Sequence, residues 1–212
     1  MKTRAQDNSR LPDSVSRRDL LAGSAATVVC AFVPASALRF AATVTAEVLN
    51  ATERHCLEAM VSRIIPADAN GAGAREAGCA LYIESALRDA YQSQKPAYSA
   101  GLAALDSCAV TRRGKRFPAL DVTDQDQILM DFERNTRVGE YLDSAAFFEL
   151  VRRHTLEGMF GDPSYGGNAN FAGWDLIGYP GLKMYVSPDL EQMNATIPRS
   201  RVSAEQLLHG SR

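Results

Sequence analysis

Apolar side chains recur at steps of one, three and four residues along much of this chain, a spacing typical of amphipathic helices. The first such stretch holds Cys56, Leu57, Met60, Val61, Ile64 and Ile65. Either Asn50 or Thr52 can cap this helix at its start, and Pro66 stops it. The pattern therefore predicts a helix that buries one face between these two boundaries.

The same spacing predicts further helices along the chain. The second is expected over residues 74–92, and the third over residues 97–108. Thr123 is the predicted N-cap of a fourth helix, and Ser144 the predicted N-cap of a fifth that continues to Gly158. Because no segment alternates convincingly with a period of two, few if any strands are expected. The sequence predicts an all-α domain of four to five helices.

Residues 161–181 have a different composition, with six glycines and four aromatic residues. Glycine allows positive φ and close backbone approach, so this segment cannot be one continuous helix. The aromatic residues supply enough apolar area to hold the loop against a surface. We therefore expect an ordered loop, in which Trp174 either packs on its own chain or inserts into a partner.

The first 37 residues have the order of an export signal. A basic leader precedes Arg17 and Arg18, which form a twin-arginine pair, and an apolar run follows over residues 20–33. This run is too short to span a bilayer, and residues 35–37 (Ala-Ser-Ala) form a small-residue cleavage site. We predict a cleaved twin-arginine signal peptide and a periplasmic protein, with an uncleaved membrane anchor as the alternative.

Charge argues against nucleic acid as a partner. The whole chain has 23 Lys plus Arg and 25 Asp plus Glu, and the leader holds five of the basic and three of the acidic residues. The remaining chain has a net charge of −4 and no basic stripe.

Residues 38–183 are predicted to form the helical domain, and residues 184–212 a tail that either wraps a partner or is disordered.

Three cysteines, Cys56, Cys79 and Cys108, remain after removal of the leader. They are either all buried thiols, or one disulfide with a spare thiol, or include a bond to another subunit. No CxxC or CxxCH motif occurs, so no covalent haem is expected in this chain.

Candidate catalytic and metal-binding residues are few. His55 and His154 are isolated on separate predicted helices, without the spacing of a zinc site. Glu157, Asp162 and Asp175 could hold a cation through oxygen atoms, but local roles are the simpler expectation: solvent exposure, turn capping and local pairing. Neither a dinucleotide fingerprint nor a phosphate-binding loop occurs. We assign no catalytic, cofactor-binding or metal-ligating residue in this chain.

Three runs of sequence carry a resemblance to a known family. They are Arg63-Ile64-Ile65-Pro66-Ala67-Asp68, Gly73-Ala74-Arg75-Glu76-Ala77-Gly78, and the stretch from Arg153-His154-Thr155 through Glu157-Gly158-Met159-Phe160-Gly161-Asp162-Pro163 to Gly173-Trp174 and Ile177-Gly178-Tyr179-Pro180-Gly181. Together they resemble the gluconate 2-dehydrogenase subunit 3 family, the small subunits that accompany flavin dehydrogenases of the glucose-methanol-choline class. The last run is the most specific.

This resemblance implies a complex in which other subunits carry FAD and haem c. The large subunit would oxidise a sugar or sugar acid, a cytochrome c subunit would pass on the electrons, and the complex could be membrane-associated through a partner. The small subunit would not be catalytic; it would support folding, assembly and export of the FAD subunit through the twin-arginine translocase. We place the partner interface at Phe160, Tyr165, Phe171, Trp174 and Tyr179. The alternative is a free-standing periplasmic binding protein or enzyme of unknown chemistry.

Overall fold

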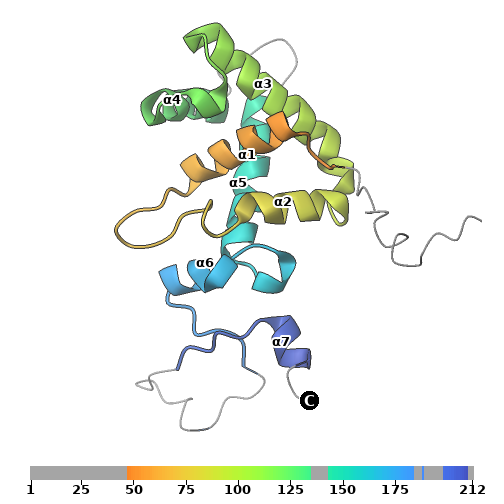
Figure 1. The fold of residues 1–212 in the computed structure, drawn as a ribbon, viewed down its shortest axis with the longest axis vertical. Coiled ribbons are helices and arrows are strands. Elements are labelled where there is room, and N and C mark those ends of the chain that lie inside the picture. Colours follow the sequence, from red (N-terminus) through yellow and green to blue (C-terminus); the bar gives the residue numbers. More distant parts are fainter. Residues whose placement is uncertain (1–46, 135–142, 184–187, 189–197, 210–212) are drawn as a thin grey trace, which may run out of the picture. The chain divides into compact units, whose positions relative to one another are not determined.

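The part of the chain that the structure describes consists of helices and connecting loops, without a β-strand (Figure 1). The computed structural model describes residues 47–134, 143–183, 188 and 198–209, which belong to a compact unit that begins at residue 46. The all-α prediction is confirmed. The predicted signal peptide, with Arg17 and Arg18, lies outside the described residues.

Five helices of ten or more residues occur in the described part of the chain, each near a predicted one. They are α1 (Ala51–Ile64), α2 (Cys79–Arg88), α3 (Lys95–Arg113), α4 (Val122–Glu133) and α5 (Ser144–Phe160). Shorter elements follow or connect them: η2 (Gln92–Gln94), η3 (Phe117–Ala119), η4 (Pro163–Tyr165), η5 (Ala169–Phe171), α6 (Ala172–Leu176) and α7 (Ala204–His209). None of the described helices is long and apolar enough to cross a membrane.

Capping side chains set most helix starts. Asn50 accepts a hydrogen bond from the backbone N–H of Glu53 at 2.9 Å, and Glu53 accepts one from Asn50 at 2.8 Å, which completes a capping box. The predicted caps of α4 and α5 are wrong: Asp121 and Asp143 serve instead of Thr123 and Ser144. Both carboxylates also place negative charge beside the helix N-terminus, where it is favourable.

The boundaries of α2 and α3 differ from the prediction for local reasons. Gly78 adopts φ +72°, which a helix interior cannot accommodate, so α2 begins at Cys79 rather than at residue 74. Conversely, α3 includes Pro96, because a proline in the first turn loses no helical hydrogen bond. The helix then runs to Arg113 and ends at Gly114, which has φ +69°.

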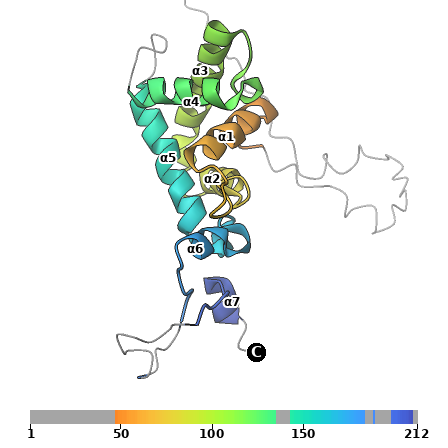
Figure 2. The ribbon, with the colours of Figure 1, turned by 90° about the vertical axis from the view of Figure 1, so that its left-hand side faces the viewer.

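One hydrophobic core joins the five long helices. Helix α5 packs against α2 and α4, and α1 contacts all four other long helices (Figure 2). The largest fully buried side chains include Tyr98, Phe117, Phe132, Leu57, Met60, Ile83, Leu102 and Ile128. Burial of each such side chain stabilises the fold by about 1.5–3 kcal/mol. The packed helices α1–α5 therefore form a stable unit, against which the segment after α5 can pack.

The three cysteines of the helical body are free and buried. Burial raises the pKa of Cys56 and of Cys79 to about 12, and it also raises the pKa of Cys108. These thiols therefore fit the first of the three alternatives, small buried apolar residues with little thiolate character.

Candidate functional site

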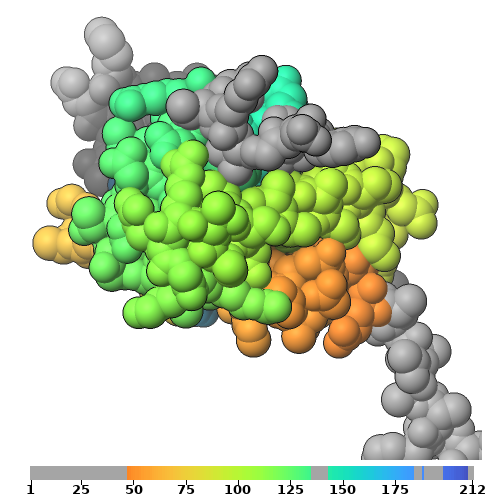
Figure 3. All heavy atoms as spheres, turned by 90° about the horizontal axis from the view of Figure 1, so that it is seen from above, coloured from red at the N-terminus to blue at the C-terminus, as the bar shows by residue number. Residues whose placement is uncertain are grey.

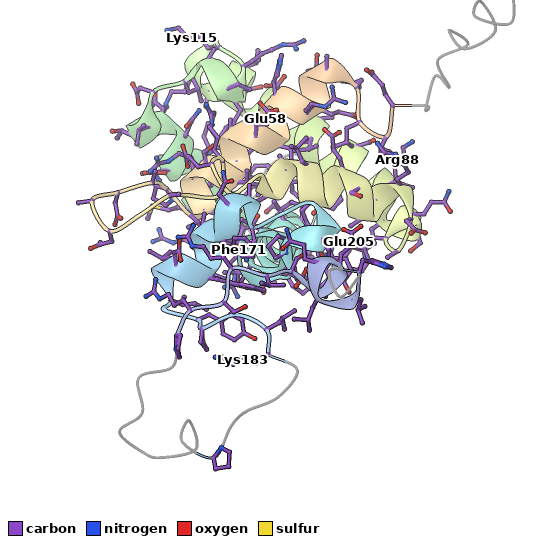
Figure 4. All side chains as sticks on the ribbon, turned by 60° about the horizontal axis from the view of Figure 1, so that its bottom comes forward. Glu58, Arg88, Lys115, Phe171, Lys183 and Glu205 are labelled. Carbon is purple, nitrogen blue, oxygen red and sulfur yellow. The ribbon has the colours of Figure 1, made fainter. Side chains whose placement is uncertain are left out.

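The glycine-rich segment after α5 folds back onto the end of that helix. Asp162 begins the turn by accepting a hydrogen bond from the Ser164 backbone N–H at 2.9 Å, which is the predicted capping role. The segment then forms η4, η5 and α6 in succession rather than one helix, as its composition indicates. Figure 4 views this end of the molecule, with Phe171 labelled on the segment.

Asn168 is fully buried, and its hydrogen bonds hold the segment together. Its Oδ1 accepts a hydrogen bond from the Gly173 N–H at 2.8 Å, and its Nδ2 donates one to the Gly161 carbonyl at 2.9 Å. Its backbone N–H donates to the Gly158 carbonyl at 2.6 Å. The residue has φ +47°, a left-handed conformation that asparagine tolerates better than most residues. Asn168 thus bridges the end of α5 to the start of α6.

Close backbone approach explains the glycine at position 173. A Cβ atom there would lie 1.8 Å from the Met159 carbonyl oxygen, far inside van der Waals contact. Only glycine lets α6 lie this close to the last turn of α5. The contact brings Trp174 directly over the helix end.

Trp174 packs on its own chain, with 6% of its surface exposed. Its indole Nε1–H donates to the Phe160 carbonyl at 2.9 Å. The rings of Phe171 and Tyr179 lie beside it, with centroids 5.4 Å and 4.8 Å away. Trp174 could either pack on its own chain or insert into a partner, and in the structure it packs on its own chain. The indole is an anchor that keeps its neighbours in place.

A groove of about 430 Å³ opens next to this aromatic cluster. Its lining residues are Phe160, Asp162, Trp174, Ile177, Tyr179, Leu182 and Ala204. Ile177 is 58% exposed at its edge, and Leu176 and Tyr179 are also exposed. An apolar groove edged by exposed apolar side chains is a candidate contact site for another protein.

The five predicted interface residues do not form one patch. Phe160, Trp174 and Tyr179 line the groove, and Phe171 lies against Trp174. Tyr165 instead lines a different cleft, beside α2. Sequence spacing could not separate these positions, because the left-handed residues between them turn the chain sharply.

The C-terminal residues 198–209 lie against the same segment. Both Arg199 and Arg201 pair with the Asp175 carboxylate, and the Ala204 N–H donates to Asp162 Oδ2 at 2.8 Å. The described part of the predicted tail is thus attached to residues 162–181 by ion pairs and hydrogen bonds. Figure 4 shows Glu205 of α7 at this end of the molecule.

The carboxylates considered as cation ligands have separate roles. Asp162 caps η4, as expected. Asp175 is paired, but its partners Arg199 and Arg201 lie 24 and 26 residues along the chain, so the pairing is not the local one expected. The expectation that Glu157 faces solvent is wrong: its Oε2 accepts hydrogen bonds from the Tyr82 and Tyr91 hydroxyls, both at 3.1 Å. Within the described residues, no group of three His, Cys, Asp or Glu side chains is placed to hold a metal ion.

His154 is buried in the core behind these tyrosines. Its ring stacks on Tyr91 with a centroid distance of 4.4 Å, and its Nδ1 lies 2.9 Å from the Tyr98 hydroxyl. Burial lowers the pKa of His154, which favours the neutral form of the ring. Its Nε2 is buried with no hydrogen-bond partner among the described residues. His154 and Glu157 therefore belong to one polar cluster between α2, α3 and α5, which the sequence alone did not predict.

A further cleft, of about 870 Å³, lies between α1 and α3, which adjoin on the face seen in Figure 3. Its charged groups already bind one another: Arg116 lies 3.5 Å from Asp106 and donates to Thr52 Oγ1 at 3.2 Å. Glu53 completes the cap of α1. The polar groups named here are therefore occupied by contacts within the chain.

Comparison with known proteins identifies a family. A family model described as gluconate 2-dehydrogenase subunit 3 matches residues 51–181, which is more than half of the chain. The matched range begins at the first residue of α1 and ends at Gly181, so it includes the five long helices and all groove-lining residues except Leu182 and Ala204. No curated protein and no solved structure matches.

Proposed function

Because the chain belongs to the gluconate 2-dehydrogenase subunit 3 family, we propose that it is a non-catalytic subunit of a periplasmic flavin-dependent dehydrogenase complex. The family name itself places the chain among the accessory subunits of dehydrogenase complexes. The finer proposal is that the chain supports folding and assembly of an FAD subunit that oxidises a sugar or sugar acid. Transfer of electrons to a cytochrome c subunit belongs to the same proposal.

The observation that carries this proposal is the ordered groove beside Trp174. It is held in shape by the chain's own hydrogen bonds, yet it leaves Ile177 and Tyr179 exposed. A surface prepared in this way loses little conformational entropy on binding, which favours a permanent subunit contact. We place the FAD subunit on this groove, with Trp174 as the buried support and Ile177 as a direct contact.

We also propose that the chain brings the FAD subunit out of the cytoplasm. The twin-arginine route carries folded proteins, so one signal on the small subunit could serve both chains. The test replaces Arg17 and Arg18 by lysine and follows both proteins by cell fractionation. Both should stay in the cytoplasm, and periplasmic dehydrogenase activity should be lost.

A matched control replaces Arg4 and Arg10 by lysine in the same leader. This change alters the same number of arginines and keeps their charge, so export should be normal. Full periplasmic activity in the variant that lacks Arg17 and Arg18 would contradict the export role. It would leave the proposed subunit contact standing, because that contact is measured separately.

A further inference from the structure

The cleft that Tyr165 lines has a volume of about 480 Å³ and lies beside the C-terminal half of α2 and the η4 turn. Its lining residues are Tyr82, Ser85, Ala86, Asp89, Ala90, Tyr91, Ser164, Tyr165 and Gly166. Three of these nine are tyrosines, and Asp89 is the one charged residue among them. The cleft thus combines aromatic rings with a single carboxylate, which is the chemistry that attracts an organic cation.

The groups behind the cleft strengthen this negative character. The Tyr82 and Tyr91 hydroxyls share the Glu157 carboxylate as acceptor. Burial and the charge of Glu157 both raise the pKa of these tyrosines, so the two side chains stay in the phenol form. Ring faces of phenols carry the negative side of the aromatic quadrupole. The Glu157 carboxylate adds negative charge at the hydroxyl ends of both rings, although Glu157 does not itself line the cleft.

The Tyr91 ring is also held in a fixed orientation. One of its faces is stacked on His154, with the two planes 5° apart, so only the other face and the edges are left for the cleft. Burial lowers the pKa of His154, which disfavours a positive charge behind the Tyr91 ring. The charge of Arg153 partly opposes the rise in the pKa of Tyr91, but Arg153 does not line the cleft.

The rim of the cleft points to a protein as the source of the cation. Leu81 is 63% exposed and Tyr165 is 66% exposed, although both are large apolar side chains. Tyr165 lines the cleft, and Leu81, which does not, lies nearby: a Cβ atom at Gly78 would be 4.0 Å from Leu81 Cδ1 and 3.6 Å from the carbonyl oxygen of Gly166, the residue after Tyr165. A small free ion would leave this rim in water, whereas a folded partner would cover it.

We propose that this cleft binds the guanidinium group of an arginine side chain on the partner subunit. The planar guanidinium can stack on the tyrosine rings and pair with the Asp89 carboxylate at the same time, which an ammonium group does less well. Leu81 and Tyr165 then form the apolar border that excludes water from the ion pair. The identity of the partner rests on the proposed function; the chemistry of the cleft does not.

The test on the isolated full-length chain uses N-acetylarginine amide, with N-acetylcitrulline amide as its neutral isostere. Ring resonances of Tyr82, Tyr91 and Tyr165 are followed by NMR during titration. The arginine derivative should shift these signals with an affinity about two- to fivefold higher than that of the citrulline derivative, as expected for an exposed cation–π contact. Equal shifts from the two compounds, or no shift of these tyrosines, would overturn the proposal.

Variants separate a binding role from a structural one. Asp89→Asn and Tyr165→Ala should each weaken binding of the arginine derivative about two- to fivefold, and Tyr165→Phe should bind like the parent because it keeps the ring face. Both positions are exposed, so the thermal unfolding temperature should not change. Equal binding of the arginine derivative by Tyr165→Ala and the parent chain would contradict the proposal that the cleft binds arginine.

The complex gives the second readout. Tyr165→Ala should lower co-purification of the FAD subunit, and Tyr165→Phe should not. Unchanged co-purification with Tyr165→Ala, alongside a loss with a substitution at Ile177, would overturn the arginine contact and keep the subunit role. If the parent chain itself brings down no flavoprotein, the proposed function fails, and the partner arginine fails with it.

Discussion

Removal of the Asn168 side chain should loosen the glycine-rich segment while the helical body stays folded. In Asn168→Ala, the Gly173 N–H and the Gly161 carbonyl lose their partners. Each buried polar group left without a hydrogen bond costs about 1–3 kcal/mol. The left-handed backbone at this position adds about 1 kcal/mol against alanine. We expect Asn168→Ala to lower the free energy of unfolding of this segment by about 3–5 kcal/mol in total. Water that enters the segment keeps this loss below the full sum of the separate costs.

The matched control is Asn170→Ala. Asn170 also has a left-handed backbone, with φ +55°, but its side chain is exposed. This variant should therefore show the backbone cost of about 1 kcal/mol without the loss of buried hydrogen bonds. The difference between the two variants isolates the contribution of the Asn168 side chain.

Hydrogen exchange followed by NMR measures the local effect. The Gly173 amide should exchange about 30-fold faster or more in Asn168→Ala than in Asn170→Ala, since each 1.4 kcal/mol is a factor of ten. Amides in the middle of α5 should keep their protection. If the two variants differ by less than about threefold at Gly173, Asn168 does not hold the segment as described.

Three other perturbations test separate parts of the structure. Gly173→Ala should force α6 away from the Met159 carbonyl and lower the thermal unfolding temperature by several degrees; an unchanged temperature would show that the contact is easily relaxed. Because burial lowers the pKa of His154 below its ordinary 6.5, the unfolded chain binds more protons below that pH, and stability should fall as pH drops from 7 to 5. Urea unfolding should show this fall reduced in His154→Gln and unchanged in His55→Gln, where the histidine is exposed; equal slopes in all three proteins would refute the assignment. Ile177→Asp should reduce recovery of the FAD subunit by affinity purification at least severalfold, whereas Val122→Asp, a change at a similarly exposed position on α4, should not.

The helical body could be predicted from sequence because each helix buries a regular apolar stripe. The start of α1 could be predicted to within two residues: the sequence offered Asn50 and Thr52 as caps, and Asn50 caps the helix, in a capping box with Glu53. The starts of α4 and α5 were missed by one or two residues because aspartate competes with Ser and Thr as a cap. Local chemistry alone does not decide between adjacent capping residues.

The groove could be predicted only in outline. Composition indicated an ordered loop anchored by aromatic rings, and Trp174 does anchor it. The role of Asn168 could not be predicted from the sequence, because its side chain binds two backbone groups that come together only in the folded chain. An asparagine among glycines is a usable signal for a left-handed turn, but it does not reveal burial. The separation of Tyr165 from Trp174 likewise follows from φ values that no spacing rule supplies.

The central claim is that this chain binds a flavoprotein and performs no turnover by itself. The most direct measurement is size-exclusion chromatography of the native periplasmic fraction, with this chain, flavin fluorescence and dehydrogenase activity recorded on the same eluate. We expect the chain to elute together with flavin and activity, and the isolated chain to show neither. Elution of the chain alone, with flavin and activity in another fraction or with turnover by the isolated chain, would contradict it.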